Sequence, residues 1–139
     1  MKKINFTVED TSTFNVLNPM TGEDICDDSG LACSITIYGI MTENYDVAKN
    51  KILNRRINRP GKKNSIEKEL RDGIELMVAN IKSLNNFGHI QINGIDVTME
   101  NIKDVLSNPS AKWFKDQIDT AIGDDRAFLS QGLQKPMKD

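Results

Sequence analysis

An apolar stripe at helical spacing runs through the middle of the chain. Asn64 precedes it as a helix cap, and Glu67 stands three residues later, where a capping-box carboxylate reaches back to the first turn. The stripe predicts a helix near residues 65–85, with Ile74 and Ile81 buried in a core. Its apolar positions are Ile66, Leu70, Ile74, Met77, Val78, Ile81 and Leu84.

Two strands are predicted before this helix. Apolar and polar residues alternate strictly over residues 33–38, and the β-branched and aromatic side chains there are typical of a half-buried strand. Residues 14–17 predict a shorter strand. The turn signal Asn18-Pro19 and a polar, acidic stretch over residues 24–30 separate the two. We therefore expect an antiparallel hairpin with a long connection.

The rest of the chain predicts three more helices and a second hairpin. Asn93-Gly94 lies between two short apolar runs, and this pair favours a type I′ turn because both positions there need a positive φ. A tight hairpin is therefore expected over residues 90–97. Thr42 is a good cap for the first of the remaining helices. Those helices are predicted near residues 43–58, 98–107 and 111–129.

The fold class follows from these elements. We expect an α+β, helix-dominated small domain of about four helices with two short β-hairpins. A chain of 139 residues matches one domain, which we place at residues 13–131. A flexible N-terminal arm over residues 1–12 and a frayed C-terminal tail over residues 132–139 are predicted beside it.

Charge and hydropathy disfavour several classes of protein. The net charge is −2, which is not the charge of an obvious nucleic-acid or membrane-surface binder. No apolar run approaches the roughly 20 residues that cross a bilayer. The opening Met1-Lys2-Lys3 is not followed by the apolar segment of a signal peptide. We expect a protein that folds and stays in a cytoplasm.

The patterns of catalytic and metal sites are missing. The cysteines Cys26 and Cys33 and the single His89 do not supply the four paired ligands of a zinc site. The acidic run 23–28 lacks the spacing of a calcium loop, and the glycines do not form a phosphate loop. The sequence therefore predicts a chain that is not an enzyme and has no cofactor, no metal and no small-molecule substrate.

A basic run is the most distinct electrostatic feature. Seven basic residues occur between positions 49 and 63 with no acidic residue among them. A solvated helix face is the simpler interpretation, and a site for nucleic-acid phosphates or for an acidic protein is the alternative. No aromatic residue lies in the run, which weakens a single-strand binding role. The basic residues are Lys49, Lys51, Arg55, Arg56, Arg59, Lys62 and Lys63.

Several short motifs occur in a fixed order between residues 14 and 130. They are Pro19-x-Thr21-Gly22-Glu23, Ile35-x-Ile37-x-Gly39 with Thr42 and Tyr45, Arg55-Arg56, the segment from Phe87 to Gly94, Thr98-x-Glu100-Asn101, Gln117-Ile118, and Asp125-Arg126-x-Phe128-Leu129. In order and spacing this set resembles a family of bacteriophage tail assembly chaperones. The sequence departs from the family pattern at Phe87 and His89, where the family tends to have Trp and Gly.

The resemblance implies a non-catalytic helper of tail assembly. Such proteins bind the long tape measure protein before tail tube subunits polymerise around it, and they leave the finished particle. The expected partners are the tape measure protein and, as a second candidate, the tail tube protein, with nucleic acid and membrane disfavoured. The expected location is the cytoplasm of the bacterial host and not the mature virion. The candidate partner-binding residues are Phe87, Trp113, Arg126 and Phe128.

Two other functions remain open at this point. One is a small nucleic-acid-binding or regulatory phage protein that uses the basic run between Lys49 and Lys63. The other is a minor structural protein that stays in the tail.

Overall fold

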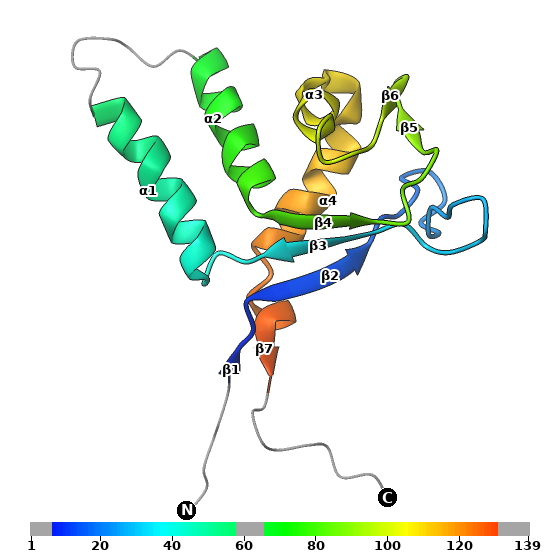
Figure 1. Ribbon diagram of the computed structural model, residues 1–139, viewed down its shortest axis with the longest axis horizontal. Helices are drawn as coiled ribbons and strands as arrows, with labels where there is room; N and C mark the ends of the chain where they lie inside the picture. Colours follow the sequence, from blue (N-terminus) through cyan, green and yellow to red (C-terminus); the bar gives the residue numbers. More distant parts are fainter. Residues whose placement is uncertain (1–6, 58–65, 131–139) are drawn as a thin grey trace, which may run out of the picture.

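The computed structural model describes residues 7–57 and 66–130 (Figure 1). A three-stranded antiparallel sheet lies at its centre in the order β2-β3-β4. Strand β2 spans Thr11–Asn15, β3 spans Ser34–Tyr38 and β4 spans Ile81–Asn85. The predicted pairing of the first two strands as a long-connection hairpin is confirmed, because Thr11 lies opposite Tyr38 and Asn15 opposite Ser34. The predicted bounds of the first strand, residues 14–17, are wrong, since β2 ends at Asn15 and Val16 and Leu17 lie beyond it.

The long central helix ends earlier than predicted. Helix α2 spans Ile66–Ala79, and the chain then enters β4, so the predicted helix over residues 65–85 is wrong over residues 80–85. Asn80 makes this change of direction. Its side chain donates to the carbonyl of Leu76 at 2.8 Å, and its own carbonyl accepts from the amide of Tyr38 at 2.8 Å. The residue is fully buried, so the turn is fixed from both sides.

A β-bulge explains why the apolar residues of β4 keep the spacing of the α2 stripe. Ile81 and Leu84 are three residues apart, which would put them on opposite faces of a regular strand. The register shifts between Thr36 and Ile37, so that Ile37 pairs with Ile81 while Thr36 pairs with Ser83. The extra residue lets both apolar side chains face the core. The predicted burial of Ile74 and Ile81 is confirmed, at 7% and 4% exposure.

The other helices match the prediction in type and differ at their ends. Helix α1 spans Glu43–Ile57 and is capped by Thr42, whose hydroxyl accepts from the amide of Tyr45 at 3.2 Å. Helix α3 spans Ile102–Ser107, and α4 spans Lys112–Ile122. The predicted extension of the last helix to residue 129 is wrong. Gly123 caps α4, and a 3-10 turn, η2, follows over Asp125–Phe128.

The second hairpin is confirmed. Strand β5 (Gln91–Ile92) pairs with β6 (Ile95–Asp96), and Asn93 and Gly94 between them have φ values of 54° and 81°. The helices, the three-stranded sheet and this hairpin form an α+β domain in which helix predominates, as the sequence predicts.

The predicted N-terminal arm differs from the structure over its second half. Strand β1 (Thr7–Val8) pairs with β7 (Leu129–Ser130), and β2 begins at Thr11. Both ends of the described chain therefore leave the domain side by side (Figure 1). They lie at the end of the molecule opposite to the far ends of α1 and α2 (Figure 1).

The two faces of the central sheet differ in chemistry. Cys33, Ile35 and Ile37 are fully buried, and α4 packs against β3. The opposite face carries uncharged polar side chains that bond across the strands. Thr13 and Thr36 share a hydroxyl hydrogen bond of 2.8 Å, and the amide of Asn85 donates to Thr36 at 3.2 Å. This alternation gives the sheet one apolar and one hydroxyl-rich face.

Candidate protein-binding groove

Helix α1 stands beside α2 with little apolar contact. Of the α1 side chains that the structure describes, Ile52 alone is buried, at 6% exposure. At the base of the pair the side-chain amide of Asn44 donates to the carbonyl of Ala79 at 3.1 Å and to the side chain of Asn80 at 3.0 Å. Half-buried Tyr45 also packs against the core, so α1 is positioned by limited apolar packing together with polar contacts.

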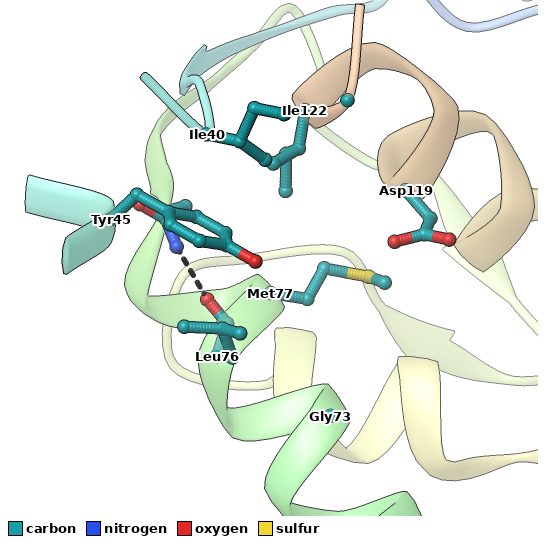
Figure 2. A pocket seen from close by; sticks show the side chains of 9 residues that line it. Ile40, Tyr45, Gly73, Leu76, Met77, Asp119 and Ile122 are labelled. Carbon is teal, nitrogen blue, oxygen red and sulfur yellow. Dashed lines mark hydrogen bonds between the residues drawn. The ribbon is translucent and has the colours of Figure 1, made fainter. Parts of the chain in front are cut away.

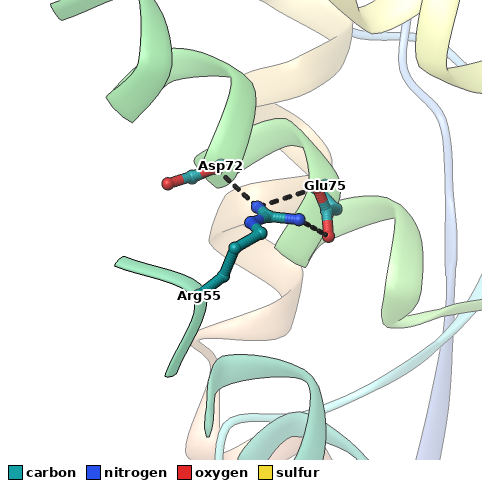
Figure 3. Close-up of polar contacts among 3 residues, drawn as sticks. All are labelled: Arg55, Asp72 and Glu75. Carbon is teal, nitrogen blue, oxygen red and sulfur yellow. Dashed lines mark hydrogen bonds and ion pairs between the residues drawn. The ribbon is translucent and has the colours of Figure 1, made fainter. Parts of the chain in front are cut away.

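Arg55 makes the main polar contact near the C-terminal end of α1 (Figure 3). Its guanidinium binds Asp72 at 2.8 Å and both carboxylate oxygens of Glu75 at 3.1 Å. We call this three-residue contact the arginine fork. The hydrogen bond to Glu75, helped by the charges of both acids, raises the pKa of Arg55 above its ordinary value. The sequence presented Arg55 as one member of a basic run, and the structure shows that it joins two helices.

An open groove lies along the face of α2 that includes Gly73. A cavity of about 180 Å³ opens between α1 and α2, where Lys49 and Leu53 face Glu69 and Leu76. A second cavity of about 90 Å³ opens between α2 and α4, beside Tyr45, Met77 and Ile122 (Figure 2). Both cavities are lined by Gly73 and Leu76, so they meet on the same face of α2. We call the pair of cavities the α2 groove.

Exposed apolar side chains continue the α2 groove toward the start of α2. Ile66 and Leu70 precede Gly73 at helical spacing and are 76% and 56% exposed. On α1, Leu53 lines the larger cavity and is 40% exposed, and Ile57, four residues later, is 72% exposed. The predicted core stripe of α2 is therefore buried only in its second half, and its first half faces outward. Clustered exposed apolar side chains of this kind mark binding surfaces.

Charged side chains stand at the edge of the α2 groove. The carboxylate of Asp119 on α4 points toward the smaller cavity, on the side across from Tyr45 (Figure 2). Glu69 lines the larger cavity, together with the amine of Lys49. All three residues are exposed. The groove thus combines an apolar lining with charges at its rim, which suits an amphipathic helix.

The structure separates the residues predicted to bind a partner. Phe87 and Phe128 are core residues, at 7% and 1% exposure. The ring of Phe87 meets Phe114 edge to face at 6.3 Å, and half-buried Trp113 lies 5.6 Å from Phe114 on its own helix. The ring of Phe128 lies against Gly39, at the opposite end of β3. The burial of both phenylalanines leaves them little surface for contact with a partner.

Arg126 lies in the turn η2, and its side chain is outside the part of the structure that is described. A wider hollow of about 420 Å³ does lie beside Phe87, where the exposed His89 has a φ of 65°. Its lining is mixed, because Asn86, Asp96 and Thr98 stand among apolar side chains such as Ile90 and Met99. An apolar partner helix is better matched by the α2 groove.

The basic run does not form one surface in the described residues. Arg55 belongs to the arginine fork, while Lys49 and Lys51 are exposed two positions apart, so they point about 200° from each other around α1. The side chain of Arg56 is not among those described, and Arg59, Lys62 and Lys63 lie outside the described residues.

The two thiols have different surroundings. Cys33 is buried, and its thiol donates to the carbonyl of Asn86 at 3.1 Å. Burial first, and then the negative charges of Asp27 and Cys26, raises the pKa of the Cys33 thiol. Cys26 is exposed. Over residues 7–57 and 66–130, no group of three or more His, Cys, Asp or Glu side chains gathers as a metal site would require.

Comparison with known proteins adds no relative, because no family model, curated protein or solved structure matches this chain. The resemblance to tail assembly chaperones therefore rests on the sequence motifs alone. Among the helices of the described ranges, none has both the length and the apolar character needed to cross a membrane.

Proposed function

We propose that this protein is a non-catalytic bacteriophage tail assembly chaperone. It binds the tape measure protein in the cytoplasm of the bacterial host, keeps it soluble until the tail tube forms, and is absent from the mature virion. The motifs between Pro19 and Leu129 support this proposal. The structural observation that carries it is the α2 groove, with Ile66 and Leu70 exposed beside it.

The chemistry of the groove fits the task. A long helical protein with an apolar face aggregates unless that face is covered, and a helix laid in an apolar groove is a common way to cover it. The contact must be weak enough for tube subunits to displace the chaperone. Single-site affinities in roughly the micromolar range, strengthened by many copies along one client, meet both needs. The tail tube protein is the second proposed partner, since it takes over the client.

Co-expression with the tape measure protein tests the proposal. We expect the tape measure protein to be soluble with this chain and to aggregate without it. The double variant Ile66→Asp, Leu70→Asp should lose this effect, because it puts charge on the exposed apolar stripe of α2. Val47→Asp is the matched control. Val47 is 61% exposed, but it lies beside Asp10 and Tyr38, away from the groove.

Two results would contradict the proposal. Unchanged solubility of the tape measure protein with the wild-type chain would remove the chaperone role. Stoichiometric amounts of the chain in purified tails would favour a minor structural protein. For the nucleic-acid alternative we expect no tight binding near physiological salt, because the arginine fork already occupies Arg55. Sub-micromolar retention of DNA or RNA that falls steeply with salt would favour that alternative instead.

A further inference from the structure

Gly73 has no role that the described fold explains. It lies in the middle of α2, it is exposed, and a Cβ built on it meets no heavy atom within 4 Å. Its φ is not in the left-handed region that would favour glycine. Glycine in a helix interior destabilises the helix relative to alanine, so a glycine here lowers stability with no packing reason among the residues that the structure describes.

Gly39, in contrast, is a glycine that the packing of the domain requires. A Cβ on Gly39 would lie 2.7 Å from the ring of Phe128, so the chain itself needs the missing side chain at that position. Gly73 also lacks a side chain, but the space that this leaves lies in the α2 groove and not inside the domain. A backbone left bare at an exposed helix position allows a second helix to approach it closely.

The side chains around Gly73 indicate what kind of helix would bind there. The exposed side chains of Ile66 and Leu70 share its helix face at spacings of seven and three residues, which is the pattern that packs against another helix, and the buried Met77 follows on the same face four residues later. Three carboxylates and one amine line the two cavities. The amine is that of Lys49, the carboxylates of Glu69 and Asp119 are exposed, and the carboxylate of Asp72 binds Arg55. Charge complementarity therefore favours a helix whose apolar stripe is flanked by basic side chains.

We propose that Gly73 is the point of closest contact between α2 and an amphipathic client helix, with a bulky apolar side chain of the client seated over Gly73 and basic client residues beside Glu69 and Asp119. This inference rests on the proposed function, and it names the site and the kind of helix that the site takes.

The test uses the full chain and overlapping helical fragments of the tape measure protein. Gly73→Ala should raise the melting temperature by about 2–4 °C, because alanine is the better helix former and has room at this position. Gly73→Leu should weaken binding of the fragments at least tenfold, because its side chain fills the contact point. A substitution that stabilises or preserves the fold and yet weakens binding cannot be acting through misfolding.

Gly88→Leu is the matched control. Gly88 is also exposed, also has open space around a built Cβ and has no left-handed φ, but it lies in the hollow beside Phe87. It should leave binding unchanged. Asp119→Asn should weaken binding and reduce its dependence on salt, while Glu67→Gln, on an exposed part of α2 outside the two cavities, should change neither.

The outcomes separate this inference from the proposed function. If the wild-type chain binds no fragment, the proposed function fails. If it binds, and Gly73→Leu binds equally well, the function stands and the inference about Gly73 is overturned. If Gly88→Leu is the variant that loses binding, the client lies beside Phe87 instead. If the wild-type chain self-associates and Gly73→Leu abolishes this association, a second copy occupies the groove and the client helix is excluded from it.

Discussion

Helices α4 and α1 are held in the molecule in different ways. Helix α4 buries Phe114, Ile118 and Ile122 against the sheet and the other helices, whereas α1 buries Ile52 alone among its described side chains. The position of α4 is therefore fixed by apolar packing, whereas α1 combines limited apolar packing by Ile52 and Tyr45 with the polar contacts of the arginine fork and Asn44. Elements with few buried contacts open most readily, so the wall of the α2 groove that α1 forms is more adaptable than the wall that α4 forms.

The largest expected effect comes from the packed region. Phe114 is fully buried between Phe87 and Trp113, so Phe114→Ala should cost about 3–5 kcal/mol of unfolding free energy through lost burial and the cavity left behind. Val47→Ala on α1 is the comparison, and it should stay within about 0.5 kcal/mol because that side chain is 61% exposed. Urea denaturation of both variants measures the difference. A similar loss for Val47→Ala would mean that this face of α1 is packed against the domain as well, which would remove the contrast.

A smaller but still large effect is expected at the contact between β3 and η2. Gly39→Ala puts a Cβ against the buried ring of Phe128, which must then move, at a cost of about 1–3 kcal/mol. Gly123→Ala is the control, because its nearest contact would be an ordinary 3.6 Å. Thermal melts should separate the two variants. Equal melting temperatures would show that Phe128 can leave Gly39 without loss and is available to a partner, as the sequence motifs suggested.

The elements that the sequence predicts correctly are those with a local signal. Strict alternation in residues 33–38 and the Asn93-Gly94 pair are local signals, so the β2–β3 hairpin and the β5–β6 hairpin were predicted correctly. Strand β4 was missed because the bulge beside Ile81 lets a strand keep the spacing of a helix face. Apolar periodicity alone does not distinguish the two.

Residue roles were harder to predict than elements. Phe87 and Phe128 were expected at a partner surface, but both are buried. An aromatic residue in a sequence motif can belong either to the core or to a binding surface, and only the three-dimensional packing distinguishes the two roles. Arg55 was counted with a basic run because its acidic partners lie 17 and 20 residues further along the chain. The one local signal that pointed to the groove was a glycine inside a helical stripe, at Gly73.

A substitution of Gln117 should have an intermediate effect on stability, because its side chain binds the backbone of a residue far away in the sequence. Its side chain accepts from the amide of Leu17 at 2.9 Å and donates to the carbonyl of the same residue at 2.8 Å, across 100 positions of sequence. Gln117→Leu should cost about 1–2 kcal/mol, since both hydrogen bonds are lost. Gln117→Glu keeps the acceptor for the Leu17 amide but lacks the donor, so it should fall between Gln117→Leu and wild type in a denaturant titration. A Gln117→Leu variant as stable as the wild type would show that water replaces the contact fully.

The smallest effect on global stability, and the most local one, is expected at the arginine fork. Arg55→Gln removes the charge that binds Asp72 and Glu75, and Arg55→Lys keeps the charge but lacks the planar pair of donors that meets two carboxylates at once. Because solvent reaches these side chains, neither change should move the melting temperature by much. Both should speed amide hydrogen exchange in α1 while leaving α4 unchanged.

The ion pair of Lys112 and Asp116 provides the matched control for that experiment. It lies on α4 at 2.7 Å, so by distance alone it equals the pair of Arg55 and Asp72 at 2.8 Å. Lys112→Gln should nevertheless leave hydrogen exchange in α4 unchanged, because Phe114, Ile118 and Ile122 hold that helix whether or not the pair forms. If α1 in the Arg55→Gln variant exchanges as slowly as in the wild type, then Ile52 and Asn44 suffice to fix α1. The α2 groove would then offer a rigid surface to the proposed client helix.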